Sequence, residues 1–230
     1  MTPAAILQER IEIPCLGDTM EGELAYPEDL PVCAALLLLN PHPQLGGNLD
    51  NNVIRHLARR FAESGALTLR FNYRGIGNST LTLPEGTIRF EYFATMEKER
   101  RYEQLKPDGL AAWNALRNAA PPGVPRILLG YSFGAILAGM IAPETGPARL
   151  AAISPPVLRV GLDMFRNVTA PKFFLAGGKD FVFEETPFRA YYDAMPAPKD
   201  YILFPDSDHF FRKEEERLFD AIAAWLEAGI

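Results

Sequence analysis

The sequence predicts an α/β domain built on a mostly parallel sheet, with an antiparallel strand pair at the N-terminal edge and helices on both faces. From residue 34 onward, short apolar runs alternate with segments of helical periodicity, which is the pattern of a parallel sheet covered by helices. The 230 residues, 48% of them hydrophobic, suffice for one domain with a sizeable core. We therefore expect residues 1–230 to form a single domain.

The expected strands follow from two kinds of apolar pattern. Residues 7–13 and 20–26 alternate loosely around Gly17 and Asp18, as in an antiparallel pair at a sheet edge. Later runs are apolar at almost every position, as in strands buried on both faces. These runs are residues 34–39, 67–71, 126–129, 150–153, 172–176 and 201–204.

Apolar residues between these runs recur at helical spacing. The stripe within residues 53–61 lies opposite Arg55, Arg59 and Arg60, which we interpret as the solvated face of one helix. Similar spacing predicts helices around residues 110–116, 136–140, 188–195 and 218–226.

Residues 81–106 are too long for an ordinary connection. They contain Phe90, Tyr92 and Phe93, followed by a charged run. One interpretation is a cap or lid whose aromatic residues face a substrate. The other is a surface excursion followed by an early start of the next helix, and the sequence leaves both open.

The composition indicates which binding partners and which cellular compartment to expect. A net charge of −6 without a dominant basic segment argues against nucleic acid or an acidic membrane as a partner. Cys15 and Cys33 have neither redox-motif nor metal-ligand spacing, so free thiols are expected, with one disulfide as the alternative. No stretch resembles a signal peptide or a membrane span. A soluble, cytoplasmic protein is expected; the sequence does not decide its oligomeric state.

Residues 130–134 read Gly-Tyr-Ser-Phe-Gly and stand between an apolar run and a helical segment. A strand that enters a helix through this pattern makes a tight turn that projects the serine hydroxyl outward. We therefore predict that Ser132 is a nucleophile. The alternative is an ordinary strand-to-helix turn in which the serine caps the helix.

A serine hydroxyl needs a base to take its proton and a carboxylate to orient that base. The chain has three histidines. His56 lies on the charged side of its helix, and His42 is better placed to organise its loop. His209 follows the last apolar strand, where a parallel sheet delivers a functional loop, and is the expected base.

The expected carboxylate is Asp180. It follows the apolar run that ends at Gly177 and Gly178, whereas Asp193 falls within a helical stretch and Asp200 opens a strand. Glu184 is the second choice, and a simple turn role for Asp180 is the alternative.

Two backbone N–H groups should bind the oxyanion of a tetrahedral intermediate. Phe133 N–H, at the start of the helix after Ser132, is the first. The second should come from residues 40–47, where Pro41 and Pro43 have no N–H to donate. Gln44 is the preferred donor, with Leu45 behind it; a rigid, proline-pinned turn is the alternative.

Taken together, several segments resemble the α/β-hydrolase superfamily, and most of all its small bacterial branch of predicted hydrolases. The segments are residues 40–52, the turn at 74–79, the Gly130–Gly134 turn, residues 178–180 and residues 208–211. The serine, acid, histidine order is also the order of that superfamily. The resemblance implies a serine hydrolase, most often a carboxylesterase or thioesterase, without a metal or organic cofactor.

The predicted function is therefore cleavage of a small-molecule carboxylic ester through an acyl-enzyme. Thioester, lactone or amide cleavage, acyl transfer, and a non-catalytic binding protein are the alternatives. An apolar acyl pocket is expected. Its candidate lining residues are His42, Leu45, Phe133, Leu158, Phe165, Phe181 and Phe183.

Overall fold

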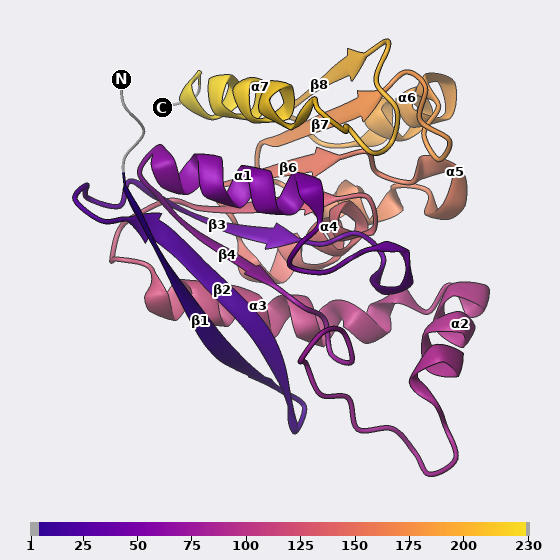
Figure 1. Ribbon diagram of the computed structural model, residues 1–230. Helices are drawn as coiled ribbons and strands as arrows, with labels where there is room; N and C mark the ends of the chain where they lie inside the picture. The colour runs from indigo at the N-terminus through magenta and orange to yellow at the C-terminus, as the bar shows by residue number, and fades with distance from the viewer. Residues whose placement is uncertain (1–4, 229–230) are drawn as a thin grey trace.

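A computed structural model describes residues 5–228, so the extreme ends of the expected 1–230 domain lie outside the described residues. Its eight strands form one sheet in the order β1-β2-β4-β3-β5-β6-β7-β8 (Figure 1). The strands are β1 (Ile6–Cys15), β2 (Asp18–Pro27), β3 (Ala34–Leu39), β4 (Ala66–Phe71), β5 (Arg126–Tyr131), β6 (Arg149–Ile153), β7 (Lys172–Gly177) and β8 (Lys199–Phe204).

The strand directions confirm the predicted fold class. β1 and β2 form an antiparallel hairpin in which Cys15 pairs with Asp18, and β2 joins β4 antiparallel. All pairings from β4 through β3 to β8 are parallel. The carboxyl ends of these six strands therefore meet at one edge of the sheet, where functional loops of such sheets gather.

Helices cover both faces of the sheet because side chains alternate along each strand. Leu36 and Leu38 of β3 face the cluster that contains α1 and α7, whereas Leu37 and Leu39 face the cluster that contains α3 and α4. Apart from the helix within residues 81–106, the longer helices are α1 (Asn52–Glu63), α3 (Lys106–Ala119), α4 (Phe133–Thr145), α6 (Glu185–Ala194) and α7 (Glu215–Glu227). No helix between residues 5 and 228 is both long enough and apolar enough to cross a bilayer.

Residues 81–106 contain a helix of their own, which the sequence analysis did not specify. After an irregular stretch comes α2 (Arg89–Glu99), then the 3₁₀ turn η2 (Tyr102–Leu105), and α3 begins at Lys106. Phe93 and Met96 are buried, but Phe90 is exposed. Figure 1 shows α2 standing away from the sheet beyond α3.

A buried polar cluster anchors the β1–β2 hairpin and the turn after β4 to α3. The carboxylate of Asp108 accepts hydrogen bonds from the backbone N–H of Arg74, at 2.9 Å, and from its Nε, at 2.7 Å. Asp108 is fully buried, and the Cys15 thiol lies 3.7 Å from it. Burial raises the pKa of Cys15 to about 11. Cys15 and Cys33 are both free thiols.

Candidate active site

Ser132 lies on the tight turn between β5 and α4. Its backbone has φ 55° and ψ −116°, a conformation that is costly for a residue with a side chain. Its N–H donates to the Ile153 carbonyl at 2.8 Å. A Cβ atom on Gly130 would come within 2.2 Å of the Gly134 oxygen, and one on Gly134 within 2.0 Å of the Leu39 oxygen. Glycine is thus required on both sides of the serine.

His209 and Asp180 reach Ser132 from two other loops at the same edge of the sheet. His209 Nε2 lies 3.1 Å from the Ser132 Oγ. His209 Nδ1 lies 2.8 Å from the Asp180 Oδ2. The structure thus brings together the three side chains that were predicted from separate segments, at the distances of a nucleophile, a base and an orienting carboxylate.

Aromatic side chains and a backbone bond hold the His209 loop. The Tyr131 hydroxyl donates to the His209 carbonyl at 2.7 Å, and burial raises the pKa of this tyrosine. The Phe181 ring packs edge-on against the imidazole at a centroid distance of 4.9 Å, and Phe210 packs against it at 5.6 Å. These contacts restrict the imidazole to the orientation that faces Ser132.

Close packing of the loops after β7 and β8 positions Asp180. A Cβ atom on Gly177 would lie 2.3 Å from the Ser207 oxygen, and one on Gly178 would lie 2.6 Å from the Pro205 oxygen. The other carboxylate oxygen of Asp180 accepts the Val182 N–H at 2.9 Å. Asp180 is buried, whereas Glu184 is exposed. The geometry therefore favours Asp180 over Glu184 as the partner of His209.

The loop after β3 differs from the expected oxyanion hole. The Gln44 N–H donates to His42 Nδ1 at 3.2 Å, and the Leu45 N–H donates to the His42 carbonyl at 2.9 Å. Both bonds belong to the 3₁₀ turn η1 (Pro43–Leu45). The structure therefore corrects the choice of Gln44, because its N–H is already used within the turn.

His42 lies at the point where this loop meets the start of α4. Its ring packs edge-on against Phe133 at a centroid distance of 5.6 Å. Within residues 5–228, its backbone N–H donates to no protein acceptor. The Phe133 N–H is likewise free, as expected for the first residue of a helix. These two N–H groups are the candidates for binding an oxyanion.

A cavity of about 170 Å³ adjoins Ser132 and His209. Four of the predicted pocket residues, His42, Leu45, Phe133 and Phe181, line it. Its other lining residues are Glu97, Tyr102, Pro156, Arg159, Val160 and Val182. These six residues were not predicted from the sequence, although Glu97 and Tyr102 belong to the long segment 81–106 and the rest flank expected strand ends.

The remaining pocket candidates lie elsewhere. Phe165 is fully buried and packs against Phe174 of β7. Phe183 is buried against Phe188 of α6. Leu158 is exposed, and its backbone N–H donates to the Val182 carbonyl at 3.1 Å. The pocket assignments of these residues are corrected, because Phe165 and Phe183 serve the core and the exposed Leu158 does not line the cavity.

Residues 81–106 contact the loop after β3. Glu97 Oε2 accepts from the Tyr102 hydroxyl at 2.8 Å and lies 3.3 Å from His42 Nε2. The Gln44 side chain donates to the Phe90 carbonyl at 3.2 Å. Burial lowers the pKa of His42, and the nearby Glu97 carboxylate opposes that effect. At neutral pH, His42 is thus an uncharged imidazole whose Nδ1 is free to accept the Gln44 N–H.

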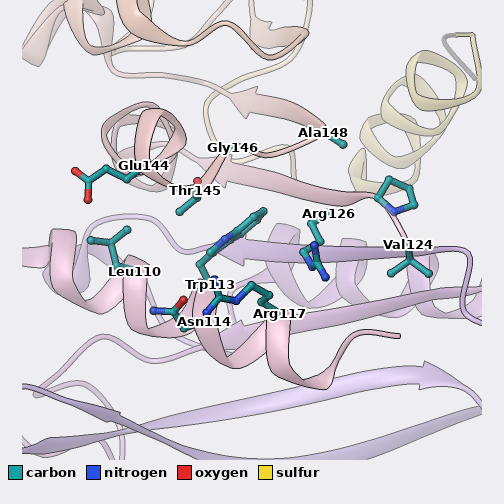
Figure 2. Close-up of a pocket in the computed structure, with 11 residues that line it drawn as sticks. Leu110, Trp113, Asn114, Arg117, Val124, Arg126, Glu144, Thr145, Gly146 and Ala148 are labelled. Carbon is teal, nitrogen blue, oxygen red and sulfur yellow. The ribbon is translucent and has the colours of Figure 1, made fainter. Parts of the chain in front are cut away.

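Other cavities lie away from this chemistry. One of about 490 Å³ is lined by α3, the end of α4 and the start of β5, including Trp113, Arg117 and Arg126 (Figure 2). It is at the amino end of β5, opposite Ser132.

His56 Nε2 lies 2.9 Å from Glu216 of α7, so the third histidine joins two helices. Residues 5–228 hold no group of three His, Cys, Asp or Glu side chains arranged to bind a metal ion.

Comparisons with known proteins agree with this architecture. No protein-family model matches the chain. An uncharacterised protein of Rickettsia prowazekii, RP471, is 27% identical over 218 residues, which cover 90% of this chain and 84% of that protein.

Two solved structures are similar over nearly the whole chain. An α/β serine hydrolase homologue from Coxiella burnetii has a TM-score of 0.78 and 23% identity, covering 95% of this chain and 97% of that one. XC6422 from Xanthomonas campestris, described as an α/β serine hydrolase without a lid, has a TM-score of 0.78 and 22% identity, covering 96% and 94%. The chain therefore has the α/β-hydrolase fold.

Proposed function

We propose that this chain is a serine hydrolase that cleaves carboxylic esters through an acyl-enzyme. The observation that carries the proposal is the continuous path from the Ser132 Oγ to His209, at 3.1 Å, and from His209 to Asp180, at 2.8 Å. The strained backbone of Ser132 supports it, because such strain concentrates at functional sites. The resemblance of the fold to serine hydrolases is consistent with it.

The proposed reaction has two halves. Ser132 Oγ attacks the ester carbonyl while His209 Nε2 takes its proton, and Asp180 holds the imidazole and stabilises its charge. His209 then protonates the departing alcohol, which leaves an acyl group on Ser132. In the second half His209 takes a proton from water, the resulting hydroxide attacks the acyl group, and the acid leaves as Ser132 regains its proton.

The backbone N–H groups of Phe133 and His42 are proposed to bind the oxyanion in both halves. The contact of the His42 ring with Phe133 and the close approach of Gly134 to Leu39 support this pairing. The cavity of about 170 Å³ is smaller than the roughly 300–1,000 Å³ of sites for drug-sized ligands. A short acyl or small aryl group fits this size best.

Residues 81–106 are proposed to act as a cap on a single domain, because Glu97 and Tyr102 line the cavity. The same three side chains would serve for a thioester, lactone or amide, or for acyl transfer. An ester is preferred over an amide because an alkoxide departs more readily than an amide anion, and His209 can protonate it as it leaves. A panel of acyl substrates with different leaving atoms separates these reactions.

The test is Ser132→Ala, assayed with short 4-nitrophenyl esters and with a fluorophosphonate probe. The wild-type protein is expected to hydrolyse the esters and to be labelled on Ser132, with loss of fluoride from the probe. The variant should do neither, while its unfolding transition stays close to that of the wild type. Unchanged turnover in the variant would refute the proposal, and an unlabelled wild-type protein would favour a binding protein.

A further inference from the structure

The cavity beside Ser132 contains one cationic side chain outside the catalytic histidine. Arg159 lines it together with Ser132, Phe133 and His209. Most of the other lining residues are apolar or aromatic. A guanidinium in such surroundings is a strong and directional site for a carboxylate, since it can donate two parallel hydrogen bonds.

Arg159 has no carboxylate of its own. Within residues 5–228, its side chain forms neither an ion pair nor a hydrogen bond with the protein, although most arginines of the chain do. The other charged residue of the cavity, Glu97, already accepts from Tyr102 and faces His42. The Glu97 carboxylate thus makes its contacts with Tyr102 and His42, and the Arg159 guanidinium has no protein partner among the described residues.

Arg159 lines the cavity from an exposed position in the fold. It belongs to the short helix α5 (Val157–Val160) that follows β6. The Arg159 N–H donates to Pro156 at 3.0 Å, and its neighbour Leu158 is tied to Val182. Burial and then Glu97 raise the pKa of Tyr102, and the charge of Arg159 opposes this rise. Arg159 also lines the same cavity as Glu97 and Tyr102 of residues 81–106.

We propose that Arg159 selects substrates that carry a carboxylate, binding it while Ser132 attacks the ester carbonyl of the same molecule. This inference rests on the proposed function, because it names the substrate class of that site. The carboxylate replaces water on the exposed guanidinium, and two parallel charge-assisted hydrogen bonds strengthen the pairing. Glu97 opposes the binding of an anion through its own charge, so its removal should increase the preference.

The test compares pairs of esters that are alike in shape and differ in charge. In one pair the charge is on the acyl side: 4-nitrophenyl hydrogen adipate and 4-nitrophenyl 6-methylheptanoate. In the other it is on the alcohol side: 4-acetoxybenzoate and 4-isopropylphenyl acetate. The readout is the ratio of kcat/KM for the anionic ester to kcat/KM for the neutral ester.

Arg159→Ala is expected to lower this ratio by roughly 10- to 100-fold in at least one pair, as the loss of a charge-assisted hydrogen bond predicts. Its kcat/KM for the neutral ester should fall by a smaller factor, because the neutral ester lacks the carboxylate that Arg159 binds. Glu97→Gln should raise the ratio. Arg166→Ala is the matched control, because Arg166 is exposed and paired with Asp163 at 2.7 Å. An unchanged ratio in Arg159→Ala for both pairs would overturn the inference.

A binding measurement keeps this inference separate from the proposed reaction. The anionic esters are titrated into Ser132→Ala and into Ser132→Ala/Arg159→Ala, where no turnover is expected. Affinity should fall roughly 10- to 100-fold in the double variant and should weaken with salt in the single variant only. Equal affinities would reject Arg159 as the anion site even if the esterase is confirmed. Turnover by Ser132→Ala would reject the reaction instead.

Discussion

Gly134 lies so close to β3 that a Cβ atom on it would come within 2.0 Å of the Leu39 carbonyl oxygen. The first turn of α4 therefore rests directly on the backbone that leads into His42. This contact places the Phe133 N–H and the loop after β3 on the same side of Ser132. The proposed oxyanion site thus depends on the absence of a side chain at residue 134.

Gly134→Ala should therefore destabilise the protein more than an alanine elsewhere in the same helix. Gly139→Ala is the matched control, because its Cβ would meet side-chain atoms of Met164 and Phe165, at 2.7 and 3.1 Å, rather than backbone. Side chains can shift, so the control should lose about 1–3 kcal/mol, the usual cost of overpacking. Urea denaturation measures both variants. Equal losses of unfolding free energy would mean that α4 moves away from β3 as easily as the side chains of Met164 and Phe165 shift.

Protonation of His42 should weaken the fold in mild acid. Burial lowers the pKa of this imidazole below its usual value of 6.5. As the pH falls below 6.5, His42 takes up a proton in the unfolded chain but not in the folded chain. The free energy of unfolding that His42 contributes above pH 6.5 is therefore lost as the pH falls toward the pKa of the folded state. The loss from this one group is at most about 1.4 kcal/mol per pH unit.

His42→Asn isolates that contribution. The asparagine oxygen can accept the Gln44 N–H as a cap of the turn, and it does not titrate in this range. The unfolding free energy of the variant should therefore fall less than that of the wild type between pH 7.5 and 5.5. Parallel pH profiles for the two proteins would mean that His42 is not the group responsible.

The strands and the order of the catalytic candidates could be predicted because each leaves a local signal. Residues 34–39 are apolar throughout, and β3 spans Ala34–Leu39 as expected. Other strands differ by a residue or two at their ends; β5, for example, continues to Tyr131. Ser132 and Asp180 each follow a buried strand, and parallel strands bring such positions to one edge of the sheet.

What could not be predicted depends on how the loops fold. Phe165 and Phe181 are the same residue type in similar loops, yet one is fully buried in the core and the other is 61% exposed beside His209. The η1 turn uses the Gln44 N–H, and no sequence pattern reveals that bond. The helix α2 has no regular apolar stripe that could predict it. Phe93 is buried in the core, whereas Phe90, in the same helix, is exposed.

Asp180→Asn should lower kcat by roughly 10⁴-fold with little effect on folding, because an amide no longer holds the imidazole in the productive tautomer or stabilises its positive charge. Glu184→Gln is the control, because Glu184 is exposed and outside the His209 contact. The Glu184→Gln variant should keep kcat within about twofold of the wild-type value. Steady-state kinetics on one activated ester, with denaturation curves for both variants, measures the difference. If Glu184→Gln lost more activity than Asp180→Asn, the carboxylate assignment would be reversed.

Asp108→Asn should destabilise the fold without acting on the site directly. The carboxylate of Asp108 is fully buried and holds both the N–H and the Nε of Arg74. Loss of one partner from a buried pair costs up to about 3–5 kcal/mol, and Asp18, 3.8 Å from Arg74, offsets part of the charge that remains. Asp163→Asn removes the exposed partner of Arg166 and should cost less than about 1 kcal/mol.

Neither Asp108 nor Asp163 lines the cavity, so kcat/KM of the folded fraction should be unchanged in both variants. Equal stability of the two variants, measured by urea denaturation, would mean that water or a rearranged turn replaces the Asp108 contact with Arg74.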